Sequence, residues 1–399
     1  MLEESSPSCT FHPLAIDAWI FVVTYHGICL GGLGIPIALW TYYVGRRHPQ
    51  WCLALAVIAP FSISLFLNYG GSAAIGLDLS SYLLSESSLP IVWIGPFLAS
   101  TFGFSTGFKL WNVAFQQHPE GADASLLIFV VWFLILPEPK FVKGKTRTLT
   151  SAEIQQHIWR FSFKIVVLSV VLSVLQSPSL DQATKHNESV LIAVLKVLPT
   201  KGETLLQEAW NGWLHLWFLY MFVSLCLELS IILIMPLTGF QEMEPAFQNP
   251  LLESRSFQEV WGTRWNLPVQ VLLQRTSYIP LRKNGYNRSV AALATFVVSG
   301  LLHEYNFYTH NFVAYRQPGV ATCFFVLMGL LMLAEKWFWN RFVPQSLQKA
   351  IETYVPSFVI AFGDMMVSAI PVERYFMKSW LEAGFVEAVA SIIPHITCR

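Results

Sequence analysis

Long apolar runs alternate with short polar connections along most of this chain. A run of about 17 to 25 apolar residues is long enough for a helix to cross roughly 30 Å of hydrocarbon. Runs of this length occur near residues 18–42, 51–67, 89–107, 158–175, 209–235, 289–308, 320–337 and 354–372. The pattern predicts an all-α fold, a polytopic integral membrane bundle with about eight transmembrane helices.

A further apolar run, "ASLLIFVVWFLIL" at 124–136, ends at Pro137 and is shorter than the others. It is too short to span a bilayer unless its flanks contribute. We therefore expect a re-entrant or interfacial segment here, in addition to the crossings.

Basic residues indicate which connections face the cytosol. With the short run not crossing, the basic connections 137–157 and 253–288 share the cytosolic side. The connection 68–88, which lacks Lys and Arg, then falls on the opposite side. Of the two glycosylation sequons, Asn187 is predicted to be lumenal and Asn287 cytosolic, so only Asn187 could carry a glycan.

Composition supports a membrane protein. The chain has 54% hydrophobic and 13% charged residues, which lies outside the range of ordinary soluble domains. Lys+Arg and Asp+Glu number 25 each, and no basic block occurs, so we expect no nucleic-acid partner. The six cysteines are scattered without C-x-x-C spacing and are expected to be packing residues.

No internal repeat or low-complexity linker divides the chain, which predicts a single domain over residues 1–399. The N-terminus is acidic and has no Lys or Arg before Arg46, which does not fit a cleavable signal peptide. The first apolar segment is therefore expected to remain as an anchor.

One predicted span, "ALATFVVSGLLHEYNFYTHN" at 292–311, carries polar residues along one side. At 100° per residue, a single sector holds Thr295, Ser299, His303, Asn306 and His310. Such a stripe should face a protein-lined or water-filled cavity, because polar groups facing lipid would lack hydrogen-bond partners. The stripe alone leaves three interpretations open: a structural histidine, a transporter pathway, or a general base in an enzyme.

Metal binding is not expected at this stripe. "HEYNFYTH" departs from H-E-x-x-H, and His303 and His310 lie about 10 Å apart along the helix axis. Glu304 points about 100° away from His303 and need not share its role.

Two short motifs suggest chemistry but are better explained otherwise. "GFSTG" at 103–107 matches the G-x-S-x-G nucleophile elbow, which requires a strand-to-helix turn in a soluble sheet. It also matches G-x-x-x-G, and helix packing is the favoured interpretation. "HPEGAD" at 118–123 has an acyltransferase-like H-x-x-x-x-D spacing without the expected phosphate-binding context, so a loop turn is favoured.

Three blocks together resemble a known family: "NPLLESRSFQEVWGTRWNLPV", "RTSYIPLR" and "ATFVVSGLLHEYNFY". They are similar to the wax synthase branch of the membrane-bound O-acyltransferase family, and the resemblance is dense over 245–310. The chain departs from the family pattern at Glu259, Val260 and Thr263. The resemblance implies a buried catalytic chamber in which Asn266 and His303 are the catalytic pair.

The resemblance also implies a substrate class and a location. It points to transfer of a fatty acyl group from acyl-CoA to a long-chain alcohol, in a multi-pass protein of the endoplasmic reticulum membrane. Acyl-CoA would be a co-substrate, and neither a cofactor nor a metal would be needed. Related members acylate sterols, diacylglycerol or terpenoid alcohols, and those acceptors stay open. The residues predicted to bind substrate are Trp261, Arg264, Trp265, Ser299 and Asn306.

Overall fold

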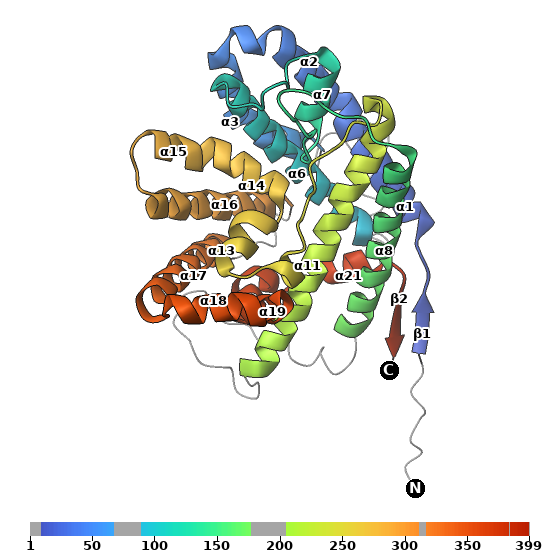
Figure 1. Ribbon diagram of the computed structural model, residues 1–399. Helices are drawn as coiled ribbons and strands as arrows, with labels where there is room; N and C mark the ends of the chain where they lie inside the picture. Colours follow the sequence, from blue (N-terminus) through green and yellow to red (C-terminus); the bar gives the residue numbers. More distant parts are fainter. Residues whose placement is uncertain (1–8, 68–88, 177–204, 311–316, 383, 399) are drawn as a thin grey trace.

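The computed structural model describes residues 9–67, 89–176, 205–310, 317–382 and 384–398, and helices make up most of them. The helices are α1 (Ile16–Ile28), α2 (Ile35–Tyr43), α3 (Pro49–Leu65), α6 (Leu89–Ala114), α7 (Leu126–Leu134), α8 (Ser151–Leu175), α11 (Leu205–Ile234), α12 (Pro250–Glu253), α13 (Phe257–Glu259), α14 (Leu267–Leu273), α15 (Ile279–Lys283), α16 (Arg288–His310), α17 (Val320–Phe342), α18 (Gln345–Tyr354), α19 (Ser357–Pro371), α20 (Lys378–Glu382) and α21 (Phe385–Ala390). The strands are β1 (Cys9–His12) and β2 (His395–Cys398). Figure 1 shows α11 through the middle of the molecule, with α8 and α1 on one side and α14 to α17 on the other. The all-α class is confirmed.

The predicted number of membrane spans is not confirmed. Within the described residues, five helical stretches are long and apolar enough to cross a membrane. These are Ile16–Arg47, Ser151–Leu175, Leu205–Thr238, Arg288–Thr309 and Val320–Phe342. A sixth is added if Gln345–Tyr354 and Ser357–Leu381, which meet at 109°, count as one bent span. The polytopic architecture is confirmed, but the count of about eight is not: the runs at 51–67, where α3 has only 17 residues, at 89–107, and at 354–372, which is one arm of a bent pair, are not among the five.

The outer face of α8 fits a hydrocarbon environment. Its exposed side chains include Trp159, Phe163, Val166 and Val170, all more than half accessible. Exposed large apolar residues in a continuous row are unusual on a soluble protein and are typical of a face that contacts lipid.

The short apolar run becomes helix α7, which has nine residues and is too short to cross a bilayer, as the sequence indicates. Ser125 begins it, and its hydroxyl accepts a hydrogen bond from the backbone N–H of Ile128 at 3.2 Å. Phe129, Trp132 and Phe133 of this helix are almost completely buried. The segment therefore packs inside the protein.

The two basic connections predicted to share one side of the membrane contact each other. The first connection also bonds to the segment after α11, which precedes the second connection: the backbone N–H of Lys140 donates to the carbonyl oxygen of Glu242 at 2.8 Å, and that of Leu149 donates to that of Phe240 at 2.8 Å. Arg275, from the second connection, binds the carboxylate of Glu138 at 2.7 Å. Residues 137–157 and 253–288 are thus in contact through Glu138 and Arg275, while the side of the membrane that they share stays a prediction. The sequon at Asn187 and the connection 68–88 lie outside the described residues.

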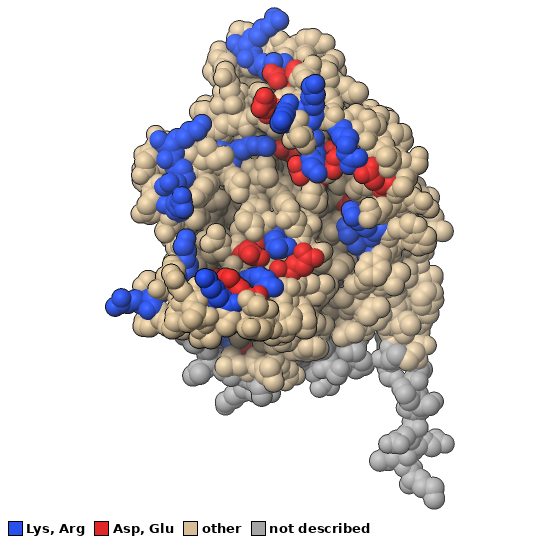
Figure 2. All heavy atoms as spheres, in the orientation of Figure 1, with Lys and Arg blue, Asp and Glu red and all other residues tan. Residues whose placement is uncertain are grey.

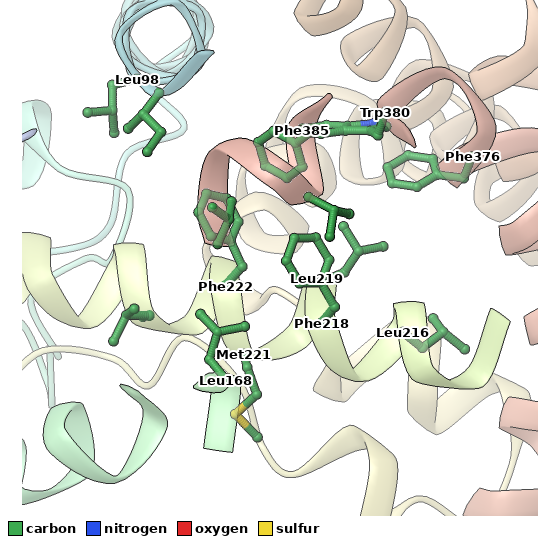
Figure 3. Packing of buried hydrophobic residues seen from close by; sticks show 14 of the residues in the cluster. Leu98, Leu168, Leu216, Phe218, Leu219, Met221, Phe222, Phe376, Trp380 and Phe385 are labelled. Carbon is green, nitrogen blue, oxygen red and sulfur yellow. The ribbon is translucent and has the colours of Figure 1, made fainter. Parts of the chain in front are cut away.

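Helix α11 supplies much of the hydrophobic core. Figure 3 shows Phe218 and Phe222 of α11 close to Phe385 and Trp380, which come from the C-terminal helices. The rings of Phe222 and Phe385 meet edge to face at 5.1 Å, and those of Trp380 and Phe385 at 4.0 Å. This cluster fixes the position of the α11 face that borders the site described below.

The "GFSTG" segment lies inside helix α6, so it is not a nucleophile elbow. A Cβ on Gly103 would lie 2.8 Å from the carbonyl oxygen of Pro60, and one on Gly107 would lie 2.9 Å from that of Ala56. Both glycines allow α6 to approach α3 closely, which confirms the packing interpretation.

The two strands join segments from opposite ends of the sequence (Figure 1). β1 and β2 are antiparallel, and Cys9 is paired with Cys398 in their register. Cys9 is disulfide-bonded, whereas Cys29, Cys52, Cys226 and Cys323 are free. The expectation that all six cysteines are packing residues is therefore wrong for Cys9, because the absence of C-x-x-C spacing does not exclude a disulfide.

Candidate active site

Two cavities meet beside helix α16. The outer cavity has a volume of about 650 Å³ and is bordered by α14 to α17. The inner cavity has a volume of about 130 Å³ and is bordered by α6, α11, α16 and the C-terminal helices. Three described residues line both cavities: Asn266, Val269 and His303. The structure thus brings the predicted catalytic pair together, in the wall between the two cavities.

The polar stripe on α16 faces these cavities. Thr295 and Ser299 line the outer cavity, His303 lines both, and Asn306 lines the inner one. The stripe therefore avoids lipid, as its polarity requires. The side chain of His310, the last residue assigned to the stripe, lies outside the described residues.

The tautomer of His303 follows from its one hydrogen bond. Nδ1 lies 2.7 Å from the backbone carbonyl oxygen of Ser299, and because a carbonyl oxygen can only accept, Nδ1 carries the proton. Nε2 of the neutral ring then has a free lone pair, which is what a general base requires. The ring stacks on Phe325 at 4.2 Å and meets Phe376 edge to face at 5.5 Å. These contacts hold the imidazole in one orientation.

Close contact with α17 positions the helix that carries His303. A Cβ on Gly300 would lie 2.6 Å from Cα of Thr322, so only glycine fits this crossing. Glu304 accepts a hydrogen bond from the backbone N–H of Thr322 at 3.0 Å, in the first turn of α17. As the sequence suggests, Glu304 has a role separate from that of His303.

Asn266 lies at a sharp change of direction just before helix α14. Its backbone is left-handed, with φ of 44°, a conformation that asparagine tolerates better than most residues. Its carbonyl oxygen accepts the first hydrogen bond of the helix, from Gln270 at 3.0 Å. Its side-chain Oδ1 is buried and has no hydrogen-bond partner. The local fold thus places an unpaired amide group at the wall between the cavities.

Four of the five predicted substrate-binding residues line the cavities, and one does not. Trp261, Trp265 and Ser299 border the outer cavity, and Asn306 borders the inner one. Arg264 borders neither; its guanidinium binds the carboxylates of Glu253 and Glu259 and the backbone of Gln248 instead. The observed partners of Arg264 give it a role in holding the chain around the π-helical turn Val260–Arg264.

Sequence reasoning missed two sets of cavity residues. Ser105 lines the inner cavity, between the two packing glycines of α6. Arg282, Arg288 and Lys336 line the outer cavity, are exposed, and form no ion pair with another described residue. Figure 2 shows basic side chains at the left of the view, over α15 and the start of α16, beside a hollow in the surface. The unassigned basic residues of "IPLRKNGYNRS" were the available signal for this rim.

Comparison with known proteins bears on this site. Residues 243–327 match the model of the membrane bound O-acyl transferase family. The resemblance inferred from the sequence is confirmed. The matched segment contains both members of the predicted catalytic pair and all five predicted substrate-binding residues.

Several relatives of the chain are plant proteins named as members of this enzyme class. The chain is 28% identical over 242 residues to the probable long-chain-alcohol O-fatty-acyltransferase 2 of Arabidopsis thaliana, covering 59% of this chain and 62% of that protein. It is 31% identical over 259 residues to the probable long-chain-alcohol O-fatty-acyltransferase 9, covering 61% and 65%. It is 23% identical over 287 residues to acyl-CoA–sterol O-acyltransferase 1 of the same plant, covering 69% and 70%. The chain thus spans less than two thirds of the length of the first two relatives.

Proposed function

We propose that this protein is an acyl-CoA-dependent O-acyltransferase of the endoplasmic reticulum membrane that esterifies a long-chain fatty alcohol to give a wax ester. The observation that carries the proposal is the position of His303 and Asn266 together in the wall between two cavities. A reaction that joins two lipid substrates needs its catalytic groups where both substrates meet. The names of the long-chain-alcohol acyltransferase relatives support the choice of acceptor.

The proposed reaction is one displacement at the thioester carbonyl carbon. Nε2 of His303 accepts the hydroxyl proton as the alcohol oxygen bonds to that carbon. The amide N–H of Asn266 donates to the oxyanion that forms. The C–S bond then breaks, and the protonated His303 returns the proton to the departing thiolate. The products are the ester and free coenzyme A, and the histidine ends neutral.

The outer cavity suits acyl-CoA. Coenzyme A carries several phosphates, and Arg282, Arg288 and Lys336 offer positive charges at the cavity margin without a described acidic partner. The volume of about 650 Å³ is within the usual range for a site that encloses a small ligand. The thioester would reach the dividing wall from this side, and burial there would keep water from it.

A sterol is the second candidate acceptor. It is favoured by the match to the sterol acyltransferase, which covers more of the chain than either of the two matches to long-chain-alcohol acyltransferases given above. The same catalytic pair would serve either acceptor, because the reacting group is a hydroxyl in both cases.

Membranes from a host that lacks neutral-lipid synthesis would test the proposal. They would receive labelled acyl-CoA with a panel of primary fatty alcohols, sterols and diacylglycerol, and the products would be separated by polarity. We expect labelled wax ester as the main product. A preference for sterol would select the second candidate, and no ester with any acceptor would refute the enzyme assignment.

Substitution at the dividing wall tests the mechanism in the same assay. His303→Ala should lower kcat by about 10²-fold or more with little change in the KM for acyl-CoA, because the lost interaction belongs to the transition state. Asn266→Ala should also lower kcat, to the extent that its amide stabilises the oxyanion. His48→Ala, an exposed histidine away from both cavities, is the matched control. Normal turnover by His303→Ala would exclude His303 as the base.

A further inference from the structure

The inner cavity contains polar atoms that its apolar lining does not satisfy. Most of its wall is formed by Phe, Leu, Val and Ile side chains. Three of its residues nevertheless carry a buried oxygen without a hydrogen-bond partner: Ser105 Oγ, Asn266 Oδ1 and Asn306 Oδ1. A buried polar atom costs free energy unless a hydrogen-bond partner satisfies it, so each of these oxygens can contribute to binding a ligand that supplies one. Ser105 is 97% buried, since its exposed fraction is only 3%, so bulk solvent does not explain it.

The chemistry of these atoms discriminates between the two substrates of the proposed reaction. A thioester and its acyl chain contain no hydrogen-bond donor, so they cannot satisfy an amide oxygen. A hydroxyl group both donates and accepts. It therefore suits the asparagine side chain of Asn306 in either orientation of the amide, and it suits the hydroxyl of Ser105 as well.

The shape of the inner cavity favours a slender ligand. Its volume of about 130 Å³ is below the range of roughly 300–1,000 Å³ in which compact small molecules bind. Five residues line both this cavity and a further void of about 30 Å³: Leu98, Phe222 and Cys226, together with His26 and Ser230, which hydrogen-bond to each other at 3.2 Å. A volume of this size suits the hydroxyl end of an unbranched hydrocarbon chain better than a bulky fused ring system.

We propose that Ser105 and Asn306 form a hydroxyl-binding pair that holds a long-chain primary alcohol in the inner cavity, with its oxygen beside His303. This inference rests on the proposed function and assigns the inner cavity to the acceptor. Ser105 donates a hydrogen bond to one lone pair of the alcohol oxygen. Before the thioester binds, Oδ1 of Asn306 accepts a hydrogen bond from the alcohol O–H. In the reaction that proton passes to Nε2 of His303, the oxygen bonds to the acyl carbon, and neither Ser105 nor Asn306 changes its protonation.

Kinetics of Ser105→Ala and Asn306→Leu test the pair. One hydrogen bond contributes a modest net free energy, so each variant should raise the KM for the fatty alcohol by about two- to tenfold. The KM for acyl-CoA should not change, because its thioester approaches from the other cavity. Ser105→Thr, which keeps the hydroxyl, should restore most of the affinity. Ser162→Ala, an exposed serine on α8, is the matched control.

An inhibitor that cannot donate separates the two members of the pair. The methyl ether of the same alcohol accepts hydrogen bonds but has no proton to give or to transfer. In the wild-type protein the alcohol should bind more tightly than the ether. Asn306→Leu should remove that difference, because the oxygen of Asn306 binds only a ligand that donates a hydrogen bond. Ser105→Ala should weaken the binding of both compounds. Competition against labelled alcohol gives both constants.

The outcomes distinguish this inference from the function on which it rests. If the wild-type protein forms fatty ester but both variants keep the wild-type KM for alcohol, the hydroxyl-binding pair is wrong and the enzyme assignment stands. An equal rise in the KM for alcohol and for acyl-CoA would also contradict it, because the inner cavity would then serve both substrates. If the wild-type protein forms no ester, the function itself fails. If Asn306→Leu does not fold, the KM values of Ser105→Ala and Ser105→Thr for the alcohol decide whether the hydroxyl-binding pair is right.

Discussion

Replacing Glu138 with alanine should destabilise the whole protein, because this carboxylate is the anion that binds Lys109 and Arg275 in a buried ion cluster. Its Oε1 lies 2.7 Å from Nζ of Lys109, 2.7 Å from the guanidinium of Arg275 and 2.9 Å from the indole nitrogen of Trp132. Lys109 has no exposed side-chain surface, and Glu138 has only 7%. Three segments distant in sequence therefore meet at one carboxylate: helix α6, helix α7 with the connection after it, and the segment that follows α14.

The expected loss of folding free energy comes from the buried positive charge that the substitution leaves without a partner. Glu138→Ala keeps Lys109 buried in helix α6 without an anion, and breaking a buried pair in this way typically costs about 3–5 kcal/mol. Glu138→Gln keeps the volume and one oxygen but removes the charge, so we expect a smaller loss. Asp123→Ala is the control: its pair with Arg46 at 3.0 Å is partly exposed and should be worth less than about 1 kcal/mol.

Thermal unfolding of purified protein in detergent would measure the difference. We expect Tm to fall by several degrees for Glu138→Ala, less for Glu138→Gln and hardly at all for Asp123→Ala. Equal Tm values for Glu138→Ala and Asp123→Ala would refute the reasoning, since Lys109 would then tolerate burial without a partner.

The same cluster predicts a pH dependence. Burial alone would raise the pKa of Glu138, but the charges of Lys109 and Arg275 outweigh it and hold that pKa below its ordinary value. A carboxyl group with a depressed folded-state pKa stabilises the protein above its unfolded pKa of about 4.3. This contribution is lost as the pH falls through the folded-state pKa. The stability advantage of the wild-type protein over Glu138→Gln should therefore be full near neutral pH and decrease below about pH 4.

Two further predictions concern helix packing and topology. Gly300→Ala should lower the free energy of unfolding by about 1–3 kcal/mol and lower ester formation, because the new Cβ would lie 2.6 Å from Cα of Thr322. Gly363→Ala is the control: this glycine has open space around it, so neither quantity should change in the same unfolding and activity assays. The predicted topology allows a glycan on Asn187 and not on Asn287. In a glycosylation-competent host, Ser189→Ala should therefore abolish the mobility shift caused by glycans, and Ser289→Ala should not. A glycan on Asn287 would place the start of α16 on the lumenal side and contradict the predicted topology.

Hydropathy predicted where helices form but not how each one is used. The run at 124–136 is as apolar as a span, yet it becomes a short helix because Pro137 follows and Phe129 and Trp132 pack inside the protein. The run at 354–372 belongs to a pair of helices that meet at 109°, and an apolarity scale contains no information about such bends. Burial inside protein and burial in lipid select the same residues, so the length of an apolar run alone does not show which helices cross the membrane.

The candidate site was predictable where its signal was local. The stripe on α16 follows from helical geometry, and it located His303, Ser299 and Asn306 beside cavities. Asn266 required the family resemblance, since its signal is a motif and not a periodicity. Ser105 was missed because the flanking glycines were sufficient to explain "GFSTG" as packing. The sequence also predicted that Arg264 binds substrate. Its guanidinium instead pairs with Glu253 and Glu259, and these partners could not be identified before the fold was known.

The arrangement at the dividing wall has a consequence for how the proposed reaction begins. His303 must present an unprotonated Nε2, and this requirement is met by a backbone carbonyl, that of Ser299, at 2.7 Å. A carbonyl oxygen fixes the proton on Nδ1 but carries no full charge, so it orients the ring without the stronger pull of a carboxylate on the developing imidazolium. The proton would then be held only briefly, which suits a base that must return it to the departing thiolate. Because every residue has a backbone carbonyl, no side-chain pattern could have revealed this partner, and substituting the Ser299 side chain should leave the tautomer unchanged.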